Sequence, residues 1–455
     1  MAITRIFGTF VTLGAAACLA FVPGTALGAT GDHGLTVSWS VAPIPPPDGI
    51  GTLTADAPQL SCTGTTFCAI MPSPGYLTTL TKAGASTVVA PHSPDPYSQD
   101  TLKSVACVTA GSCIAIGSTA EGPWDPLHVY RDLLNDGTWT SSDGQTSAFD
   151  QIACGTENCV AIGNVMDQGP FEARIDDKVA GGRWGSGTLT IPFAQADRPP
   201  DVTLVSATCA RVGGCVALGY ADGKNVPLRP VLFSHRGGGW QGVAEVFPAG
   251  ANPSVAAGTS GAVAGMSCVA SYNCIGLGQY VDRSTGRSHL FAEILHNGTL
   301  SAHALPLTRS AVGVTAGPMD CVSMTECAGV ASWQGADNRT HAMLVRLHAG
   351  SWSMTPAPRP LNAVAGSSVT VNDVACAATS TCVAVGSYQV AGQSGSRPGE
   401  WIWTGGRWVA HGISSGMSAT NQSLTSIECL SASKCTAVGV FDGQPVFGRA
   451  TLVSG

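Results

Sequence analysis

The stretch Val374-Ala375-Cys376-Ala377-Ala378-Thr379-Ser380-Thr381-Cys382-Val383-Ala384-Val385-Gly386 holds two cysteines five residues apart, followed by an apolar segment that ends on glycine. Cysteine pairs of this kind recur eight times, one of them with four intervening residues, and successive pairs begin 45 to 59 residues apart. A period of this length predicts one structural unit written eight times. The pairs are Cys62–Cys68, Cys107–Cys113, Cys154–Cys159, Cys209–Cys215, Cys268–Cys274, Cys321–Cys327, Cys376–Cys382 and Cys429–Cys435.

The remaining cysteine, Cys18, lies in an N-terminal segment typical of a secretory signal. Arg5 precedes an apolar run over residues 6–22, and small residues follow around Gly28 and Ala29. This pattern predicts a signal peptide over residues 1–29 and a secreted, extracellular mature protein over residues 30–455. A membrane anchor is the competing interpretation, but the uninterrupted apolar run falls short of the roughly 20 residues that span a bilayer.

Export leaves sixteen cysteines, an even number, in an oxidising compartment where paired cysteines form disulfides. Zinc is the alternative, although zinc ligands are usually spaced by two to four residues in two neighbouring knuckles. We therefore expect a disulfide within each pair. A hairpin places opposed residues within disulfide reach, so each bridge would join two adjacent strands.

The amino-acid composition limits the classes of partner that we expect. Only 11% of residues are charged, the net charge is −7, and no basic stripe carries interleaved aromatic residues. We therefore expect no nucleic acid partner. No further segment could span a membrane, and we expect a monomer. The 57 glycines and 28 prolines, together with the lack of helical periodicity, favour a fold of short strands and turns.

Each copy contains four short segments that are apolar or β-branched and bounded by turn residues, which is typical of strands. The first ends at the first cysteine, the second starts at the second cysteine, and the fourth usually opens on tryptophan. Trp139, Trp184, Trp240, Trp352 and Trp408 hold that position, where we expect packing between neighbouring units. Four antiparallel strands in every repeat predict the blades of a β-propeller.

The two ends of the chain complement one another. The eighth copy stops after its third segment, and a tryptophan-containing segment over residues 35–43 precedes the first copy. An N-terminal strand that completes the last blade would close the ring and remove its open edges. We therefore predict one all-β domain, an eight-bladed propeller of four-stranded antiparallel blades. Two smaller propellers are the alternative, but no linker divides the copies.

The repeat resembles that of secreted actinobacterial β-propeller proteins. The resemblance rests on Val105-Ala106-Cys107 with Cys113-Ile114-Ala115-Ile116-Gly117, on the matching segments around Cys376 and Cys382, and on the Gly-x-Trp strands; it covers about residues 35 to 455. The first copy departs from it, because Met71-Pro72 replaces the glycine. The resemblance implies an exported propeller and no particular activity, so it assigns no catalytic residue.

Three acidic residues are candidates for catalysis. Asp320 and Glu428 immediately precede their cysteines, and Asp373 lies three residues before Cys376. Side chains at these offsets share one strand face, so in adjacent blades they could converge as a carboxylate pair for acid/base chemistry or as a sugar or cation site. The alternative is a polar, water-filled channel, since other copies carry serine or glutamine there.

Histidines and loop aspartates are candidate metal ligands. His128, His289 and His341 follow the second cysteine of their copies by fourteen or fifteen residues, but they open the third strand, far from the axis. Aspartates follow the second strand in five copies, at Asp167, Asp222, Asp282, Asp337 and Asp442. Turn formation explains them, with structural calcium as the alternative. We expect no other cofactor.

Three functions remain open. The first is a secreted module that binds an extracellular glycan or protein through variable loops on the face opposite the disulfides. Those loops cover residues 118–126, 195–201, 279–288, 334–340 and 389–399. The second is a carbohydrate-active enzyme, a glycosidase or polysaccharide lyase, with its site at the channel mouth. The third is a structural scaffold of the cell envelope. Motifs for nucleotide binding, zinc proteolysis and α/β-hydrolase chemistry are absent from the sequence.

Overall fold

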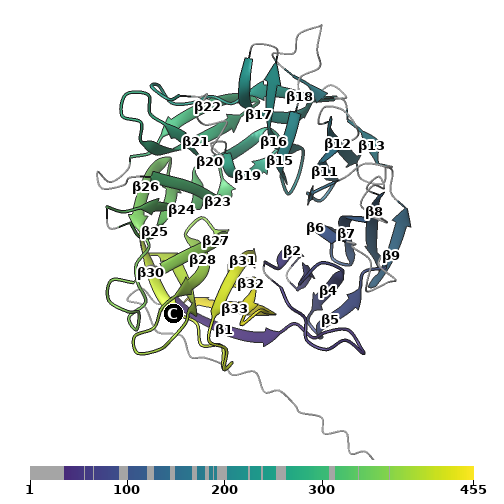
Figure 1. Ribbon diagram of the computed structural model, residues 1–455, viewed down its shortest axis with the longest axis vertical. Helices are drawn as coiled ribbons and strands as arrows, with labels where there is room; N and C mark the ends of the chain where they lie inside the picture. Colours follow the sequence, from purple (N-terminus) through teal and green to yellow (C-terminus); the bar gives the residue numbers. More distant parts are fainter. Residues whose placement is uncertain are drawn as a thin grey trace, which may run out of the picture.

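The sheets of this computed structural model are arranged in a ring, and the inner strand of each sheet lies nearest its centre, which we call the channel (Figure 1). The structure describes residues 35–55, 57–64, 66–91, 101–119, 128–143, 149–165, 172–179, 184–187, 189–191, 202–223, 226–236, 239–252, 263–306, 313–336, 338–367 and 369–454. The predicted signal peptide and Cys18 lie outside these residues. Within them, no helix has the length and hydrophobicity that a membrane crossing would require.

The strands form eight sheets, which we number by the cysteine pair that each contains. Sheet 1 has β2 (Gln59–Thr63), β3 (Phe67–Met71), β4 (Tyr76–Thr81) and β5 (Gly84–Val89). Sheet 2 has β6 (Thr101–Thr109), β7 (Ser112–Thr119), β8 (His128–Asn135) and β9 (Thr138–Asp143). Sheet 3 has β10 (Gln151–Cys154), β11 (Asn158–Val165), β12 (Glu172–Val179) and β13 (Gly185–Ser186). Sheet 4 has β15 (Val202–Cys209), β16 (Cys215–Gly223), β17 (Val226–Arg236), β18 (Gly239–Ala244) and, outermost, β14 (Leu189–Thr190).

The remaining sheets repeat the same order from the channel outward. Sheet 5 has β19 (Val263–Ala270), β20 (Asn273–Val281), β21 (Ser288–His296) and β22 (Thr299–Ala304). Sheet 6 has β23 (Gly313–Ser323), β24 (Glu326–Gln334), β25 (Thr340–His348) and β26 (Ser351–Pro356). Sheet 7 has β27 (Val369–Ala378), β28 (Thr381–Tyr388), β29 (Arg397–Thr404) and β30 (Arg407–Gly412). Sheet 8 has β31 (Gln422–Ser431), β32 (Lys434–Phe441), β33 (Gln444–Ser454) and β1 (Leu35–Pro43).

The prediction of eight four-stranded antiparallel blades is corrected in one respect. Seven sheets are such blades, but sheet 4 has a fifth strand, β14, which runs parallel to β18. The preceding strand β13 is only two residues long, so the chain leaves sheet 3 early. Leu189 and Ile191 then pack against the buried cluster that contains Trp240. Burial of these two apolar side chains favours pairing with the neighbouring sheet.

The N-terminal strand closes the ring as the sequence indicated. β1 pairs antiparallel with β33 along its whole length, from Leu35 opposite Ser454 to Pro43 opposite Val446. Trp39 of β1 is buried, and its Nε1 donates a 2.5 Å hydrogen bond to the buried carboxylate of Glu400 in β29. The closing strand is therefore bound both to its own sheet and to sheet 7.

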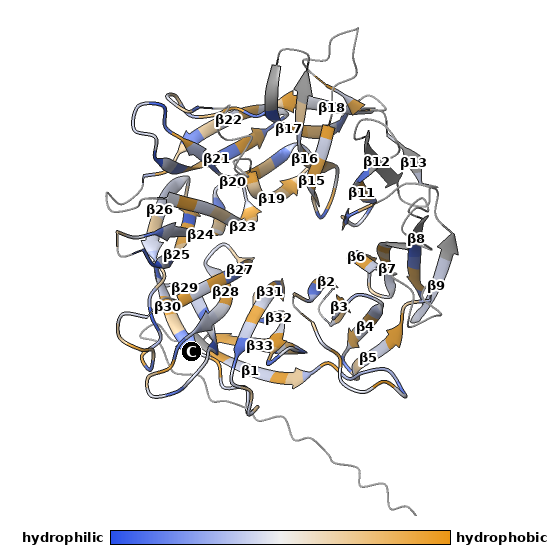
Figure 2. Ribbon diagram, in the orientation of Figure 1, coloured by the Kyte–Doolittle hydropathy of each residue, from blue (hydrophilic) through white to orange (hydrophobic). Residues whose placement is uncertain are grey.

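The hydrophobic cores lie between adjacent sheets. Trp139 belongs to a cluster shared by sheets 1 and 2, Trp240 to one shared by sheets 3 and 4, and Trp408 to one shared by sheets 6 and 7. Trp184 and Trp352 are partly buried against equivalent clusters. Figure 2 shows hydrophobic segments along the strands that contribute to these cores. The recurring tryptophan is thus confirmed as a packing residue between neighbouring units.

The recurring glycine near the end of the second strand faces a β-bulge in the first. In sheet 7 the register of β27 against β28 shifts between Val371 and Asp373. A Cβ placed on Gly386 would lie 1.9 Å from the Thr370 carbonyl oxygen. Gly439 has the same relation to the Ser423 carbonyl, at 2.1 Å. A side chain cannot fit where the bulged backbone approaches so closely, which explains why the repeat has glycine here.

We predict that Gly386→Ala destabilises the fold, because the added methyl group must displace the backbone of β27. The free energy of unfolding should fall by about 1–3 kcal/mol, the usual cost of overpacking. Gly313→Ala is the matched control, since nothing lies within 4 Å of a Cβ at the start of β23. Denaturant titration of both variants measures the difference, and equal stability of the two would contradict the explanation.

Candidate functional site

All eight predicted disulfides are present, and each joins the first two strands of its sheet. Their Cα–Cα distances are 3.9–4.0 Å. Because each bridge lies beside the turn between these strands, the eight bridges lie at the same end of the ring. We call this the cysteine end. The hairpins are thereby fixed where the inner strands surround the channel.

A cavity of about 440 Å³ opens in the channel at the cysteine end. It lies among the inner strands of sheets 4 to 8. Its polar lining residues include Thr208, Arg211, Ser267, Asp320 and Ser431. Its apolar lining residues include Met266, Met319, Val322 and Leu430. Arg211 is exposed at the tip of the β15–β16 hairpin. The cavity therefore combines hydroxyl groups, one cation and one carboxyl group.

Side chains from one inner strand accept hydrogen bonds from the backbone of the next. Inner strands form the edges of their sheets, so some of their N–H groups have no strand partner. Within the described ranges, six junctions between adjacent sheets use such an acceptor. The bonds run from Cys107 N to Ser61 Oγ, Ala207 N to Gln151 Oε1, Cys321 N to Ser267 Oγ, Cys376 N to Asp320 Oδ2, Ile427 N to Asp373 Oδ2, and Cys62 N to Glu428 Oε2, at 2.7–3.0 Å.

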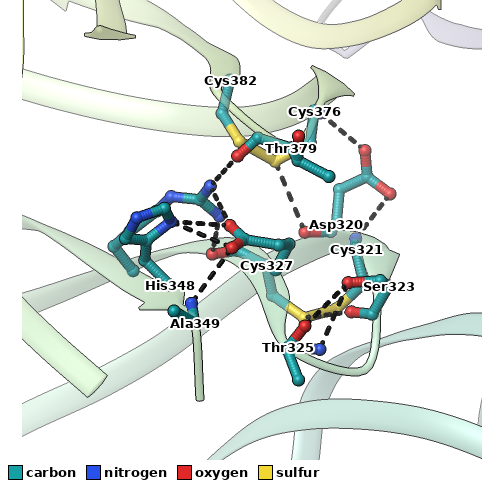
Figure 3. Close-up of polar contacts among 12 residues, drawn as sticks. Asp320, Cys321, Ser323, Thr325, Cys327, His348, Ala349, Cys376, Thr379 and Cys382 are labelled. Atoms are coloured by element: carbon teal, nitrogen blue, oxygen red, sulfur yellow. Dashed lines mark hydrogen bonds and ion pairs between the residues drawn. A yellow bond between two sulfur atoms is a disulfide. The ribbon is translucent and has the colours of Figure 1, made fainter. Parts of the chain in front are cut away.

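Asp320 shows this arrangement at the junction of sheets 6 and 7 (Figure 3). Its Oδ2 accepts from Cys376 N at 2.7 Å, while Oδ1 accepts from Cys321 N at 2.9 Å and from Ser267 Oγ at 3.3 Å. Burial raises the pKa of Asp320, and these hydrogen bonds and the charge of Arg211 oppose the rise. Asp320 is the one candidate carboxyl group that lines the cavity.

Asp373 and Glu428 occupy the next two junctions. Asp373 Oδ2 accepts from Ser426 Oγ at 2.8 Å and from Ile427 N at 2.9 Å, and Glu428 Oε2 accepts from Cys62 N at 2.8 Å. Burial raises the pKa of Asp373 to about 6 and that of Glu428 to about 8. The charges of Asp373 and Asp320 add to the rise at Glu428. The three predicted carboxyl groups thus lie at three consecutive junctions, and each accepts a hydrogen bond from the backbone of the next sheet.

The candidate histidines do not converge. His289 stacks on Tyr280 of the adjacent strand, with ring centroids 5.5 Å apart, and His341 stacks on Trp333 at 4.8 Å. These pairs belong to sheets 5 and 6 and lie where the third strand begins. His128 opens β8 in sheet 2, and its side chain is outside the described part of the chain. The two described histidines therefore act as aromatic packing partners.

Two loop aspartates form turns and loop contacts. Asp282 Oδ1 accepts hydrogen bonds from the backbone and hydroxyl groups of Ser284 and Thr285, at 2.6–3.0 Å. Asp442 accepts from Thr420 N at 2.6 Å and Asn421 N at 2.8 Å. Asp167 and Asp337 lie outside the described residues, as does the side chain of Asp222. Across the described ranges, no three His, Cys, Asp or Glu side chains are grouped to hold a metal ion.

Two buried pairs of ionisable side chains were not predicted from the sequence. Glu245 and Glu293 lie between sheets 4 and 5, and burial raises the pKa of both, with the charge of Glu293 adding to the rise at Glu245. Arg346 is fully buried between sheets 6 and 7 and donates to Glu326 Oε2 at 2.7 Å. A single glutamate or arginine in a strand gives no signal of its partner, because the partner comes from another strand.

Stability should fall as the pH rises from about 4.5 to about 8, with Glu428 as a main contributor. In the unfolded chain a glutamate loses its proton near pH ~4.3. In the fold, Glu428 keeps its proton up to a pKa of about 8, so the folded state binds more protons across this window. Each such group costs about 1.4 kcal/mol of stability per pH unit within its window. Asp373 adds to the effect up to its pKa of about 6.

Melting temperatures measured at pH 5 and pH 8 test this prediction. Glu428→Gln keeps a carbonyl acceptor for Cys62 N but cannot ionise, so its melting temperature should decline less than that of the wild type. Glu157→Gln changes an exposed residue and should decline as the wild type does. Parallel profiles for all three proteins would exclude Glu428 as a source of the pH dependence.

No protein-family model matches the chain, and comparison with curated proteins gives no match. Among solved structures, the WD40 domain of SCAP from fission yeast is similar with a TM-score of 0.46 and 9% identity, over 91% of this chain and 98% of that one. The β-propeller domain of the Trilobed protease from Pyrococcus furiosus has a TM-score of 0.43 and 6% identity, over 77% and 95%. A GH74 enzyme from Niastella koreensis has 0.33 and 12%, over 84% of this chain and 64% of that one. At these values the likenesses assign no activity to the chain.

Proposed function

We propose that this protein is a secreted binding protein that takes a short extracellular saccharide in the channel cavity at the cysteine end. The observation that carries the proposal is the lining of that cavity, where Arg211, Asp320 and the hydroxyl groups of Thr208, Ser267 and Ser431 surround one space. A saccharide presents many hydroxyl groups, each of which both donates and accepts hydrogen bonds, as this set of side chains does.

The size and rigidity of the cavity support this ligand class. A volume of about 440 Å³ lies within the range of small-molecule sites. Met266 and Met319 supply apolar surface for the carbon face of a sugar ring. The disulfide hairpins hold the lining strands in place before a ligand arrives, which reduces the ordering cost of binding.

The hydrogen bonds that the three inner carboxyl groups accept favour a binding function over catalysis. Asp320, Asp373 and Glu428 each accept a hydrogen bond from the backbone of the adjacent sheet, so their immediate task is to join neighbouring units. Loops on the opposite face were the predicted binding surface. Of these, residues 279–288 and 389–399 are described in full, and that prediction remains to be tested alongside the cavity.

Arg211→Ala should weaken saccharide binding by about tenfold or more, because a charged hydrogen bond contributes about 1.5–3 kcal/mol. Isothermal titration with oligosaccharides first selected on a glycan array measures the change. Arg211 is exposed, so the variant should fold normally. The secreted protein used for the assay should begin near residue 30, which N-terminal sequencing checks.

Arg283→Ala is the matched control, since Arg283 is an exposed arginine in the loop between β20 and β21 on the opposite face. Loss of binding in Arg211→Ala alone supports the cavity, and loss in Arg283→Ala alone supports the opposite-face loops. Array results without any saccharide ligand would overturn the proposal and favour a protein partner.

A carbohydrate-active enzyme is the second candidate, favoured by the raised pKa values of Asp373 and Glu428. A carboxyl group that is still protonated near neutral pH can act as a general acid. On this hypothesis, Asp373→Asn and Glu428→Gln should lower polysaccharide cleavage by orders of magnitude while the fold persists, as judged by circular dichroism. Reducing-sugar release and unsaturated-product absorbance separate a glycosidase from a lyase. Activity that persists in both variants would exclude these residues as catalysts.

A further inference from the structure

A second cavity, of about 360 Å³, lies at the cysteine end where sheet 8 meets sheet 1. We call it the seam cavity. It adjoins the channel cavity, because Leu430 lines both. Its lining comes from the turn before β3, from β3, β4 and the turn after β4 in sheet 1, and from the β31–β32 hairpin and β33 in sheet 8. The residues with polar side chains are Thr66, Lys82, Lys434, Thr436, Arg449 and Thr451.

Three cations line this cavity without a carboxylate. Lys82 and Lys434 are two of only five lysines in a chain whose net charge is −7, so their meeting here is not a consequence of a basic surface. Arg449 reaches across the seam and donates to the Thr81 carbonyl oxygen, and its guanidinium lies 5.8 Å from the centre of the Phe447 ring. Among the described residues, no carboxylate forms an ion pair with any of the three cations.

The equivalent position in sheet 6 holds an arginine that does have a carboxylate partner. Arg346 is fully buried, and its guanidinium donates to Glu326 Oε2 at 2.7 Å and to the Thr379 carbonyl oxygen of sheet 7 at 2.7 Å. Figure 3 shows Thr379, whose carbonyl oxygen accepts one of these hydrogen bonds, and the disulfide cysteines of both sheets. One internal carboxylate therefore balances the charge of Arg346 at the seam between sheets 6 and 7.

Arg449 and Arg346 occupy the same register position. Arg346 lies opposite Ala328, the residue after Cys327, and Arg449 lies opposite Thr436, the residue after Cys435. The residue before the second cysteine is Glu326 in sheet 6 and Lys434 in sheet 8. The seam of sheets 8 and 1 thus keeps the arginine but has a second cation where the balancing carboxylate would be.

We propose that an external oxyanion, a phosphate or sulfate ester, binds in the seam cavity and takes the place that the Glu326 carboxylate has in sheet 6. Arginine binds such groups through paired N–H donors, and lysine adds point charge. Burial lowers the pKa of the Arg449 guanidinium, as it does that of Arg346, but only at Arg346 does a neighbouring glutamate oppose the shift.

The size of the cavity indicates what carries the anion. A water molecule occupies about 30 Å³ in the liquid, so 360 Å³ is far more than a bare oxyanion fills. The space suits an ester on a group the size of a monosaccharide, with Thr66 and Thr451 as hydroxyl partners for the remainder. This site is separate from the saccharide site proposed above and does not depend on it.

Isothermal titration with glucose 6-phosphate, glucose 6-sulfate and unmodified glucose tests the site. At least one ester should bind and should bind more tightly than glucose, and the comparison of the two esters identifies the oxyanion. Lys434→Gln and Lys82→Gln should each weaken ester binding by about tenfold, the loss expected for one charged hydrogen bond. Both lysines are exposed, so neither change should disturb folding.

Lys103→Gln is the matched control, because Lys103 is an exposed lysine on β6 outside the cavity and should leave ester affinity unchanged. Lys434→Glu reproduces the arrangement of sheet 6: the new carboxylate should pair with Arg449, abolish ester binding and raise the melting temperature. Arg211→Ala should leave ester binding intact, which separates this site from the channel cavity.

Absence of binding by both esters would overturn the proposal. Equal loss in Lys103→Gln and Lys434→Gln would overturn it too, since binding would then reflect general charge. Loss of ester binding in Arg211→Ala alone would place the anion in the channel cavity and would likewise exclude the seam cavity.

Discussion

The packing of the sheets around the channel depends on how the backbone N–H groups of each inner strand find hydrogen-bond acceptors. A strand that borders the channel has backbone N–H groups with no neighbouring strand, and leaving them unpaired in a closed ring would be costly. Here a side chain from the preceding sheet supplies the acceptor at six junctions, and at three of these it is a carboxyl group. The same contacts bring adjacent sheets into register and determine which groups face the channel.

This constraint accounts for the unusual electrostatics. Carboxyl groups placed between sheets are buried, and burial raises the pKa values of Asp320, Asp373 and Glu428. A raised pKa is often a mark of catalysis, but structural acceptors produce it as well. The cavities at the cysteine end are therefore better guides to function, because their linings include charged side chains that the fold does not use to join its sheets: Arg211, Lys82 and Lys434.

Much of the fold could be predicted because it depends on short-range patterns. Opposed cysteines in a hairpin predicted the disulfides, and the terminal segment over residues 35–43 predicted the closing strand. The fifth strand of sheet 4 could not be predicted, since Leu189 joins the next sheet through contacts that no local pattern records. For the site, the sequence placed Asp320, Asp373 and Glu428 on inner strands correctly. It did not show that their oxygens point to the neighbouring backbone, nor that Arg211 and Lys82 line cavities.

The sequence alone therefore determined the repeating unit, the disulfides, the closing strand and the packing role of the tryptophans, because each follows from spacing within one copy or from the match between the two ends. Only the tertiary structure decided what the differing residues do. Lys434 and Glu326 hold the same place in two copies, yet one lines an open cavity and the other completes a buried ion pair. That difference arises from contacts between sheets, where a residue's role depends on which side chain the adjacent sheet presents.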